Sequence, residues 1–275
     1  MNPINKREVI NMLTLLLKYA KRVLTLLIVA FLLTTTVVTA KTNEYINYKV
    51  ETQVEQSVET EVPAWQQREC DVIVRVGEYN AKSGKRIYLD QVDIRWKDIP
   101  TDIKIHQDKQ GYYIHEYDIN LKSATKLYNE LKSRGVNVKL QVANGKSEDL
   151  NASARISNKS NPKLYISIHH DYYNNKAKGY HAIYNQNDDI GKAIAQRLSN
   201  SIKDNGQVPQ RDCRPNANNY IGELSHLNKS TCGVLLELGF FSSNELKEIV
   251  SDEYSDYTST HLANEIVEIL DDYWK

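Results

Sequence analysis

The chain has 275 residues, which leaves room for one or two domains, and 41% of them are hydrophobic, enough for a sizeable core. Its 35 Lys and Arg residues balance its 35 Asp and Glu residues, so the chain as a whole lacks the positive charge typical of proteins that bind nucleic acid. The three widely spaced cysteines include no CxxC pair, which excludes a cysteine-rich zinc site. Three cysteines allow one disulfide bridge, but we expect free buried thiols.

The N-terminal segment combines basic residues with a long apolar run. Residues 1–22 carry five basic side chains and one acidic side chain, and residues 23–40 carry no charge. About 18 apolar residues reach the lower limit for a bilayer span, and a basic flank keeps the N-terminus cytoplasmic. The ending Val38-Thr39-Ala40 also resembles a cleavage site for a signal peptide. We therefore expect 23–40 to be either a transmembrane anchor or a signal peptide, and the rest to be exported to the cell envelope, membrane-anchored or secreted.

A polar stretch separates this segment from the folded part of the chain. Residues 51–61 contain four glutamates and no Lys or Arg, and Pro63 follows. Such a composition is typical of a solvated linker and not of a core. We expect residues 41–67 to form an extracytoplasmic linker and residues 68–275 to form one domain.

From Cys70 onwards, strand-like and helix-like patterns alternate. Strands are predicted at 71–76, 136–142, 164–169, 179–184 and 233–241, and helices at 116–134, 148–158, 190–202, 244–250 and 258–274. The alternation over 86–96, inside the polar stretch 80–110, predicts a hairpin or an inserted strand. Strands that alternate with helices predict an α/β fold, here a single three-layer domain whose mainly parallel, twisted sheet has helices on both faces.

The predicted strand at 164–169 ends in an unusual polar group. The sequence Lys163–Asp171 is apolar until it reaches His169, His170 and Asp171. In open α/β sheets the chemistry collects at the carboxyl ends of the strands. Successive strand residues point to opposite faces, so only one of the two histidines faces a site there, and the other has a structural role.

Two glutamates complete a candidate site. Glu116 begins a predicted helix, where an acidic residue also has an ordinary explanation in the helix dipole. Glu237 interrupts the apolar strand 233–241, and a carboxylate there is costly unless it is paired or lies near a metal. Burial raises the pKa of such a group and suits it to act as a general base. Two ligands on separate elements and a buried carboxylate indicate a catalytic zinc site.

Several segments resemble the zinc-dependent N-acetylmuramoyl-L-alanine amidases of the type-3 class, from about Asp71 to the C-terminus. The segments that carry the resemblance are Glu116-Tyr-Asp-Ile-Asn-Leu121, the helix with Arg155, Tyr165-Ile-Ser-Ile-His169, Lys178-Gly179 and Leu235-Leu-Glu-Leu-Gly-Phe-Phe-Ser-Ser-Asn244. The resemblance implies a phosphorylase/hydrolase-like fold. It also implies that Glu116 and His169 bind Zn²⁺, that Glu237 is the catalytic base, and that His169 and not His170 faces the site.

The first strand departs from the family's pattern. The family has Asp-Pro-Gly-His-Gly there, with the histidine as the first zinc ligand, whereas this chain has Arg75-Val-Gly-Glu-Tyr79. Glu78 therefore becomes the expected third metal ligand, in a harder and more anionic Glu/Glu/His site. Other histidines can replace it in principle, and the sequence leaves them open: His106, His115, His181 and His226. The stretch from Glu78 to Glu116 also predicts an insertion near the cleft.

The sequence thus predicts an exported peptidoglycan hydrolase. It would cleave the amide between N-acetylmuramic acid and the L-alanine of the stem peptide, with peptidoglycan as its partner, a membrane contact through the N-terminal segment, and no nucleic acid. Tyr172, Tyr173 and Asn174 are candidates for contacts with glycan or peptide, although no substrate-binding residue follows from the sequence itself. The alternative is a catalytically degenerate domain that binds peptidoglycan or a partner without cleaving it; a purely structural anchor protein does not explain the Glu/His/Glu set.

Overall fold

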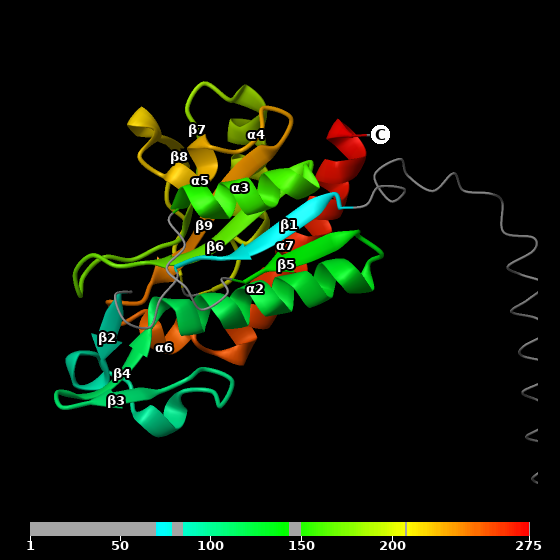
Figure 1. Ribbon diagram of the computed structural model, residues 1–275. Helices are drawn as coiled ribbons and strands as arrows, with labels where there is room; N and C mark the ends of the chain where they lie inside the picture. Colours follow the sequence, from blue (N-terminus) through cyan, green and yellow to red (C-terminus); the bar gives the residue numbers. More distant parts are fainter. Residues whose placement is uncertain (1–69, 79–84, 143–149, 207, 275) are drawn as a thin grey trace, which may run out of the picture. The chain divides into compact units, whose positions relative to one another are not determined.

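A computed structural model describes residues 70–78, 85–142, 150–206 and 208–274. Within this part a six-stranded sheet has the order β5-β1-β6-β9-β7-β8 (Figure 1). Its strands are β1 Val72–Val76, β5 Val138–Gln141, β6 Leu164–Asp171, β7 His181–Asn185, β8 Arg214–Asn216 and β9 Cys232–Phe240. Strands β5, β1, β6 and β9 are parallel, β7 runs antiparallel to β9, and β8 runs parallel to β7. The predicted α/β domain with a mainly parallel sheet is confirmed.

Helices cover both faces of the sheet. One face carries α2 Glu116–Ser133, α4 Asp189–Ser201, α6 Leu246–Ile249 and α7 Asp252–Tyr273, and the other carries α3 Leu150–Ser160 and the short α5 Gly222–Ser225. The alternation along β6 explains the two layers. Leu164, Ile166 and Ile168 join the large core beneath α2 and α7, while Tyr165 joins the smaller core beside α5. Ser167 and His169 point to the same face of the sheet as Tyr165, so polar side chains follow Tyr165 along β6 towards its carboxyl end.

The position of α2 follows from its sequence. Ile119, Leu127 and Leu131 recur at helical spacing and are buried in the large core. The helix ends before Gly135, whose φ of 78° lies in the left-handed region that favours glycine, as predicted. The first residue of α2 therefore lies at the carboxyl ends of β1 and β6, as Figure 1 shows.

A second, three-stranded sheet is inserted between β1 and α2. It has the order β2-β4-β3, with β2 Arg86–Tyr88, β3 His106–Asp108 and β4 Gly111–His115, and two short 3₁₀ turns follow β2. The prediction of a hairpin or inserted strand at 86–96 is confirmed only for its first three residues, because β2 pairs with β4 and the chain then turns. In Figure 1 this small sheet lies on the side to which the carboxyl ends of β1 and β6 point.

Most other predicted elements differ from the structure only at their ends. β6 continues two residues beyond His169, β7 begins at His181 and not at Gly179, and α6 covers four residues only. Cys70, Cys213 and Cys232 are free thiols, and Cys213 is only half-buried. The predicted segments 1–22, 23–40 and 41–67 lie outside the described residues, as does the start of the helix predicted at 148. Within the described ranges, no helix has the length and apolar character needed to cross a membrane.

Candidate active site

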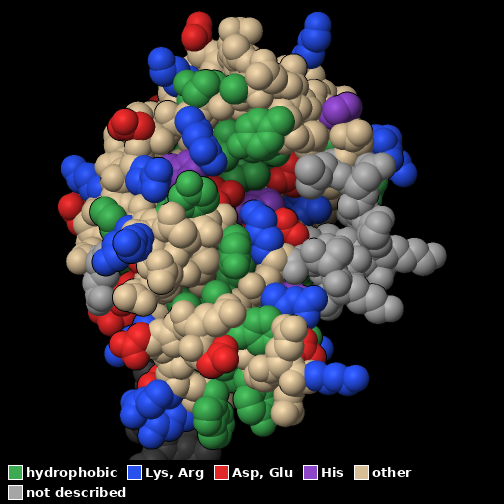
Figure 2. Space-filling model, turned by 90° about the vertical axis from the view of Figure 1, so that its left-hand side faces the viewer, with side chains coloured by type: hydrophobic (Ala, Val, Ile, Leu, Met, Phe, Trp, Pro, Cys, Tyr) green, Lys and Arg blue, Asp and Glu red, His purple; other side chains and the backbone are tan. Residues whose placement is uncertain are grey.

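Three polar side chains form a row across the carboxyl edge of the main sheet. His169 of β6 lies opposite Glu237 of β9, and Glu237 lies opposite His181 of β7. Directly opposed residues of neighbouring strands point to the same face, so these three side chains share one side of the sheet. Figure 2 shows the side of the molecule onto which this edge opens, and there histidine and acidic side chains lie close to Lys and Arg side chains.

Glu116 reaches this row from the first turn of α2. Its Oε1 lies 3.2 Å from His169 Nδ1 and accepts a hydrogen bond from Asn120 Nδ2 at 3.1 Å. Its Oε2 is buried and has no hydrogen-bond partner among the described residues. The carboxylate lies in the first turn of the helix, where the helix dipole favours an acidic residue. The structure thus brings together Glu116 and His169, which were predicted as metal ligands from separate elements.

The other ring nitrogen of His169 contacts a residue that the sequence analysis missed. His169 Nε2 lies 3.0 Å from Glu223 Oε1 and 3.1 Å from Ser167 Oγ. Burial disfavours a charged ring, but the hydrogen bonds to Glu116 and Glu223 outweigh burial and hold the pKa of His169 well above its usual value. One carboxylate faces each ring nitrogen, which fixes the orientation of the ring.

Glu223 is itself part of a buried polar network beneath the site. Its Oε2 lies 3.4 Å from Arg75 Nε and accepts a hydrogen bond from Tyr165 OH at 3.2 Å, and its Oε1 accepts one from Ser167 Oγ at 3.0 Å. Arg75 also donates to Ser153 Oγ and to the Val76 carbonyl. Burial alone would raise the pKa of Glu223, but the charges of His169 and Arg75 lower it to about 2.

Arg75, a charged residue inside the apolar strand β1, was the available signal for Glu223. A guanidinium at the end of a buried strand is costly unless an anion accompanies it. Arg75 is only 2% exposed, so its guanidinium requires an acid nearby, and Glu223 supplies it. The buried cation of Arg75 and the buried acid of Glu223 form one unit.

Glu237, the predicted base, has the environment that such a role requires. Its Oε2 is buried without a hydrogen-bond partner among the described residues. Burial is the largest cause that raises the pKa of Glu237 to about 8; the charge of His169 opposes this rise, and Glu116 and Asp171 add to it. A carboxyl group whose pKa lies near neutrality exchanges protons readily at physiological pH.

Glu78 lies two residues after the end of β1 with a φ of 46°, in the left-handed region. Burial raises the pKa of Glu78, and so does the nearby charge of Glu116, while His169 and Lys85 oppose the rise. These electrostatic interactions put Glu78 in the neighbourhood of the Glu116–His169 pair. Nevertheless, no group of three His, Cys, Asp or Glu side chains is arranged to hold a metal ion within the described ranges. The structure therefore brings two of the three predicted ligands, Glu116 and His169, into contact, and Glu78 does not complete a three-ligand site with them.

The donor atoms of this pair fit a metal ion. Two ligands of a tetrahedral zinc ion with bonds of about 2.0 Å are about 3.3 Å apart. Glu116 Oε1 and His169 Nδ1 are 3.2 Å apart, and the buried Glu116 Oε2 still lacks a partner in the described part of the chain. One nitrogen and one carboxylate oxygen suit zinc, with further positions for Glu78 or water.

The remaining histidines have other contacts. His170 points to the opposite face, as predicted, with its Nδ1 2.7 Å from Asn120 Oδ1, and burial, followed by the charge of His169, lowers its pKa to about 3. His106 pairs with Asp118 at 2.9 Å, and the ring of His115 packs edge-on against that of His106. His226 is exposed and its Nδ1 lies 2.9 Å from the Gly222 carbonyl. Of the four alternatives to Glu78, only His181 lies in the row with Glu237.

Lys85 is a second site residue that the sequence analysis did not single out. It directly precedes β2, in the insertion, and its backbone carbonyl accepts a hydrogen bond from Glu116 N at 3.0 Å. Burial opposes the charge on its amine, but the carboxylates of the site, Glu116 foremost and then Glu237, raise its pKa. The inserted segment thus supplies a cation to an otherwise acidic cleft.

Gly77 makes room for the His169 ring. A Cβ atom at this position would lie 2.3 Å from both His169 Cδ2 and Nε2 and 2.4 Å from the Ile168 carbonyl oxygen. No side chain tolerates such distances, so the glycine lets β1 approach the histidine closely.

We expect Gly77→Ala to lower the free energy of unfolding by about 1–3 kcal/mol, because the added methyl overpacks the site. It should also weaken Zn²⁺ binding, since the His169 ring must move away. Urea unfolding and zinc titration measure the two effects. Gly206→Ala is the control for the steric contact. Gly206 has a φ of +87°, but a Cβ atom added there would have no neighbouring atom within 4 Å. If Gly77→Ala and the control have equal zinc affinity, the close approach of residue 77 to the His169 ring does not affect the site.

His181 is buried at 3% exposure, and neither ring nitrogen has a hydrogen-bond partner among the described residues. Burial, together with the charges of Arg214 and Arg211, lowers its pKa to about 3 from a usual value of 6.5. Below pH 6.5 the unfolded chain therefore takes up a proton that the folded chain refuses. The folded state loses stability as the pH falls towards 3, by about 1.4 kcal/mol per pH unit from this residue.

We accordingly expect His181→Leu to reduce the acid sensitivity of the fold. Between pH 7 and pH 5 the wild type should lose about 2 kcal/mol more of its free energy of unfolding than the variant. Urea unfolding at both pH values measures the difference. His261→Leu is a matched control, because His261 lies on α7 with its Nδ1 2.8 Å from the Tyr257 carbonyl. An identical pH dependence of wild type and His181→Leu would show that His181 is not buried in its neutral form.

Comparison with known proteins supports the predicted family. Residues 105–268 match the family model Amidase_3, described as N-acetylmuramoyl-L-alanine amidase. This range includes Glu116, His169, Glu223 and Glu237 but leaves out β1 and Glu78. A search of curated proteins gave no match.

Solved structures of such amidases share the fold. The N-acetylmuramoyl-L-alanine amidase from Clostridium difficile 630 is 21% identical with a TM-score of 0.56, and the match covers 75% of this chain and 99% of that one. The catalytic domain of CwlV from Bacillus (Paenibacillus) polymyxa var. colistinus is 17% identical with a TM-score of 0.55, covering 74% and 98%. Ami1 from Mycobacterium smegmatis is 16% identical with a TM-score of 0.55, covering 74% and 97%. At such identities the likeness shows the fold alone. The family match, however, spans more than half of the chain, and the protein therefore belongs to the N-acetylmuramoyl-L-alanine amidase family Amidase_3.

Proposed function

We propose that this protein is a zinc-dependent peptidoglycan hydrolase that cleaves the amide bond between N-acetylmuramic acid and the L-alanine of the stem peptide. The observation that carries the proposal is the meeting of Glu116 and His169 at 3.2 Å, with Glu237 opposite His169 on the neighbouring strand. A pair of potential metal ligands beside a carboxyl group of raised pKa is an arrangement suited to metal-assisted hydrolysis of an amide.

Each residue has a distinct role in this proposal. Glu116 and His169 would hold the Zn²⁺ ion, with Glu78 as the third protein ligand, and Glu223 would keep the His169 ring in place through Nε2. A bound Zn²⁺ ion polarises a carbonyl and lowers the pKa of a bound water. Glu237 takes a proton from the attacking water and passes it to the amide nitrogen. The carbon–nitrogen bond then breaks, which leaves a carboxylate on the muramic acid and a free amine on the peptide.

The cell envelope is the proposed place of action. The basic residues 1–22 and the uncharged run 23–40 support export, with 23–40 as anchor or signal peptide and 41–67 as linker to the domain. Peptidoglycan lies outside the membrane, so an exported domain at 68–275 would meet its substrate there.

A catalytically degenerate domain is the second candidate, and three observations favour it. Glu78 stands where the family's pattern has a histidine, and no three-ligand metal site is formed in the part of the chain that the structure describes. The family match also begins at residue 105, after this strand. Such a domain would bind peptidoglycan or a partner and leave the amide intact.

Metal content and product formation together decide between the two candidates. The full chain, purified in detergent micelles because of residues 23–40, is incubated with Zn²⁺ and then with purified cell walls. The hydrolase should hold about one zinc ion per chain and release stem peptides with a new L-alanine amino terminus. No release with any divalent ion, from a folded protein, would establish the degenerate domain.

Glu78→His tests the third ligand in the same preparation. A neutral imidazole in place of a carboxylate restores the family's ligand set and removes one negative charge from the site. We expect Zn²⁺ affinity to rise by at least about 10-fold if Glu78 occupies the first coordination shell, as measured by competition with a chelating dye. An unchanged affinity would place Glu78 outside that shell, and Glu78→Gln, which keeps the shape and removes the charge, separates geometry from electrostatics.

A further inference from the structure

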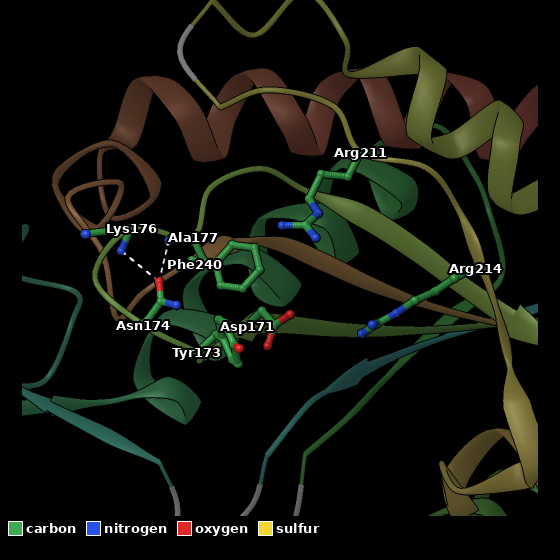
Figure 3. Close-up of a pocket in the computed structure, with 8 residues that line it drawn as sticks. All are labelled: Asp171, Tyr173, Asn174, Lys176, Ala177, Arg211, Arg214 and Phe240. Atoms are coloured by element: carbon green, nitrogen blue, oxygen red, sulfur yellow. Dashed lines mark hydrogen bonds between the residues drawn. The ribbon is translucent and has the colours of Figure 1, made fainter.

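A cavity of about 530 Å³ opens beside the proposed active site. Figure 3 shows its lining, which comes from the end of β6, the loop after it, the segment before β8, β8 itself and the end of β9. The residues that line it are Asp171, Tyr173, Asn174, Lys176, Ala177, Arg211, Arg214 and Phe240. Asp171 follows His169 by two residues and Phe240 follows Glu237 by three, so the cavity adjoins both.

The cavity is positively charged. Three cationic side chains, Lys176, Arg211 and Arg214, face a single carboxylate, Asp171. In Figure 3 the guanidinium groups of Arg211 and Arg214 point from two places on the wall into the same space. Guanidinium groups that converge on one space are suited to a planar anion, because each can donate two parallel hydrogen bonds.

The two arginines differ in how they are held. Arg211 lies over the ring of Phe240, 5.3 Å from its centroid, and donates to the Lys178 carbonyl at 3.2 Å. Arg214 is exposed, and its guanidinium has no hydrogen-bond or ion-pair partner in the described part of the chain. Arg214 therefore keeps its full donor capacity for a ligand. Arg211 also borders a second cavity with Arg214 and His181, so the basic surface continues along the row that contains Glu237.

The opposite wall is fixed by local hydrogen bonds. Asn174 Oδ1 accepts from the backbone N of Lys176 at 3.0 Å and of Ala177 at 2.9 Å, which closes a tight turn. Tyr173 N donates to Ser242 Oγ at 3.0 Å and ties this loop to the segment after β9. The loop in which we had expected contacts with substrate thus forms one side of the cavity.

We propose that this cavity binds a carboxylate of the stem peptide, with Arg214 as the principal donor and Arg211 as its neighbour. The inference rests on the proposed function. N-acetylated sugars carry no charge, whereas a peptide ends in a free carboxylate, so a basic cavity beside the catalytic residues favours the peptide side of the scissile bond. The site would select stem peptides by their charge.

Binding of paired ligands tests the proposal without relying on cleavage. The full chain carrying Glu237→Gln is titrated with a muramoyl peptide whose carboxyl groups are free and with the same peptide bearing carboxamides. We expect the free acid to bind about 10- to 100-fold more tightly, the range for hydrogen bonds to a charged group. Arg214→Ala should abolish this preference. Arg214→Lys should keep part of it, because lysine has the positive charge but cannot donate two parallel hydrogen bonds to one carboxylate.

Arg95→Ala is the matched control, since Arg95 is an exposed arginine paired with Asp98 at 2.6 Å in the inserted segment. It should keep the full preference for the free acid. Equal affinity of the Glu237→Gln chain for both peptides, or a preference that survives the further change Arg214→Ala, overturns the proposal. If the preference depends on Arg214 but the wild type cleaves no substrate, the carboxylate site is supported and the proposed hydrolase activity is overturned. If the wild type cleaves its substrate but the chain shows no preference for the free acid, the hydrolase activity is supported and the carboxylate site is overturned.

Discussion

Replacing Glu237 by Gln is expected to lower the rate of amide cleavage by about 10²- to 10⁴-fold, the usual contribution of a general base. The amide has nearly the shape of the carboxylate but cannot take a proton from water. Zn²⁺ affinity should stay within a few-fold of the wild type, because the proposed metal ligands are Glu116 and His169, 3.2 Å apart, and not Glu237. The free energy of unfolding should stay the same or rise, because Glu237 Oε2 has no hydrogen-bond partner among the described residues.

Glu245 provides the matched comparison for this variant. It is a buried glutamate, and burial raises its pKa as it does that of Glu237, but its Oε1 accepts from Gly179 N at 2.8 Å and its Oε2 from Phe240 N at 3.0 Å. Glu245→Gln turns one of these acceptors into a donor and should cost about 1–3 kcal/mol of unfolding free energy. Its cleavage rate should remain within a few-fold of the wild type.

Steady-state cleavage of a soluble muramoyl peptide and urea unfolding, measured on both variants, separate catalysis from stability. We expect Glu237→Gln to lower the cleavage rate without lowering the free energy of unfolding. We expect Glu245→Gln to lower the free energy of unfolding while the cleavage rate stays close to that of the wild type. A Glu237→Gln protein that binds zinc and cleaves at nearly the wild-type rate would show that another group removes the proton from water.

The parts of the site that the sequence predicted are those whose signal is local. His169 and Glu237 interrupt apolar strands, and Glu116 begins a helix with clear periodicity, so each stood out in its own segment. The parallel pairing of β6 with β9 then places His169 opposite Glu237. Strand periodicity also predicted correctly that His169 and His170 point to opposite faces, and the family resemblance indicated that His169 faces the site.

The parts that were missed depend on contacts between distant segments. Glu223 lies on α5, a helix of four residues after a polar stretch, and only its contact with Arg75 and His169 gives it a role. Lys85 reaches the site only because the inserted sheet lies at the carboxyl edge of the main sheet. Strands β3 and β4 contain polar and aromatic residues without a simple alternation, and they are held by pairing with each other.

Glu223→Gln is expected to cause the largest loss of stability, about 3–5 kcal/mol of unfolding free energy, because it leaves the Arg75 guanidinium in the core without its counter-charge. The two residues are 1% and 2% exposed, so water screens neither of them. The same change weakens the contact of 3.0 Å with His169 Nε2, and loss of such a partner typically lowers metal affinity by about 10- to 100-fold.

A double variant separates the two roles of Glu223. Arg75→Met combined with Glu223→Leu replaces a buried ion pair with apolar side chains, a change that is often neutral or stabilising. Tyr165 OH and Ser167 Oγ lose an acceptor, but each has another polar neighbour, Ser153 Oγ at 3.4 Å and His169 Nε2 at 3.1 Å respectively. We therefore expect urea unfolding to show that most of the lost stability is regained.

Zinc affinity should not be regained in this double variant. His169 Nε2 would keep only the Ser167 hydroxyl, a weaker partner than a carboxylate, and the ring would be less firmly oriented towards Glu116. Competition with a chelating dye measures this affinity independently of cleavage. If the double variant recovers both stability and zinc affinity, then Glu223 serves only to neutralise Arg75; if it recovers stability alone, Glu223 is the residue that positions the metal-binding histidine.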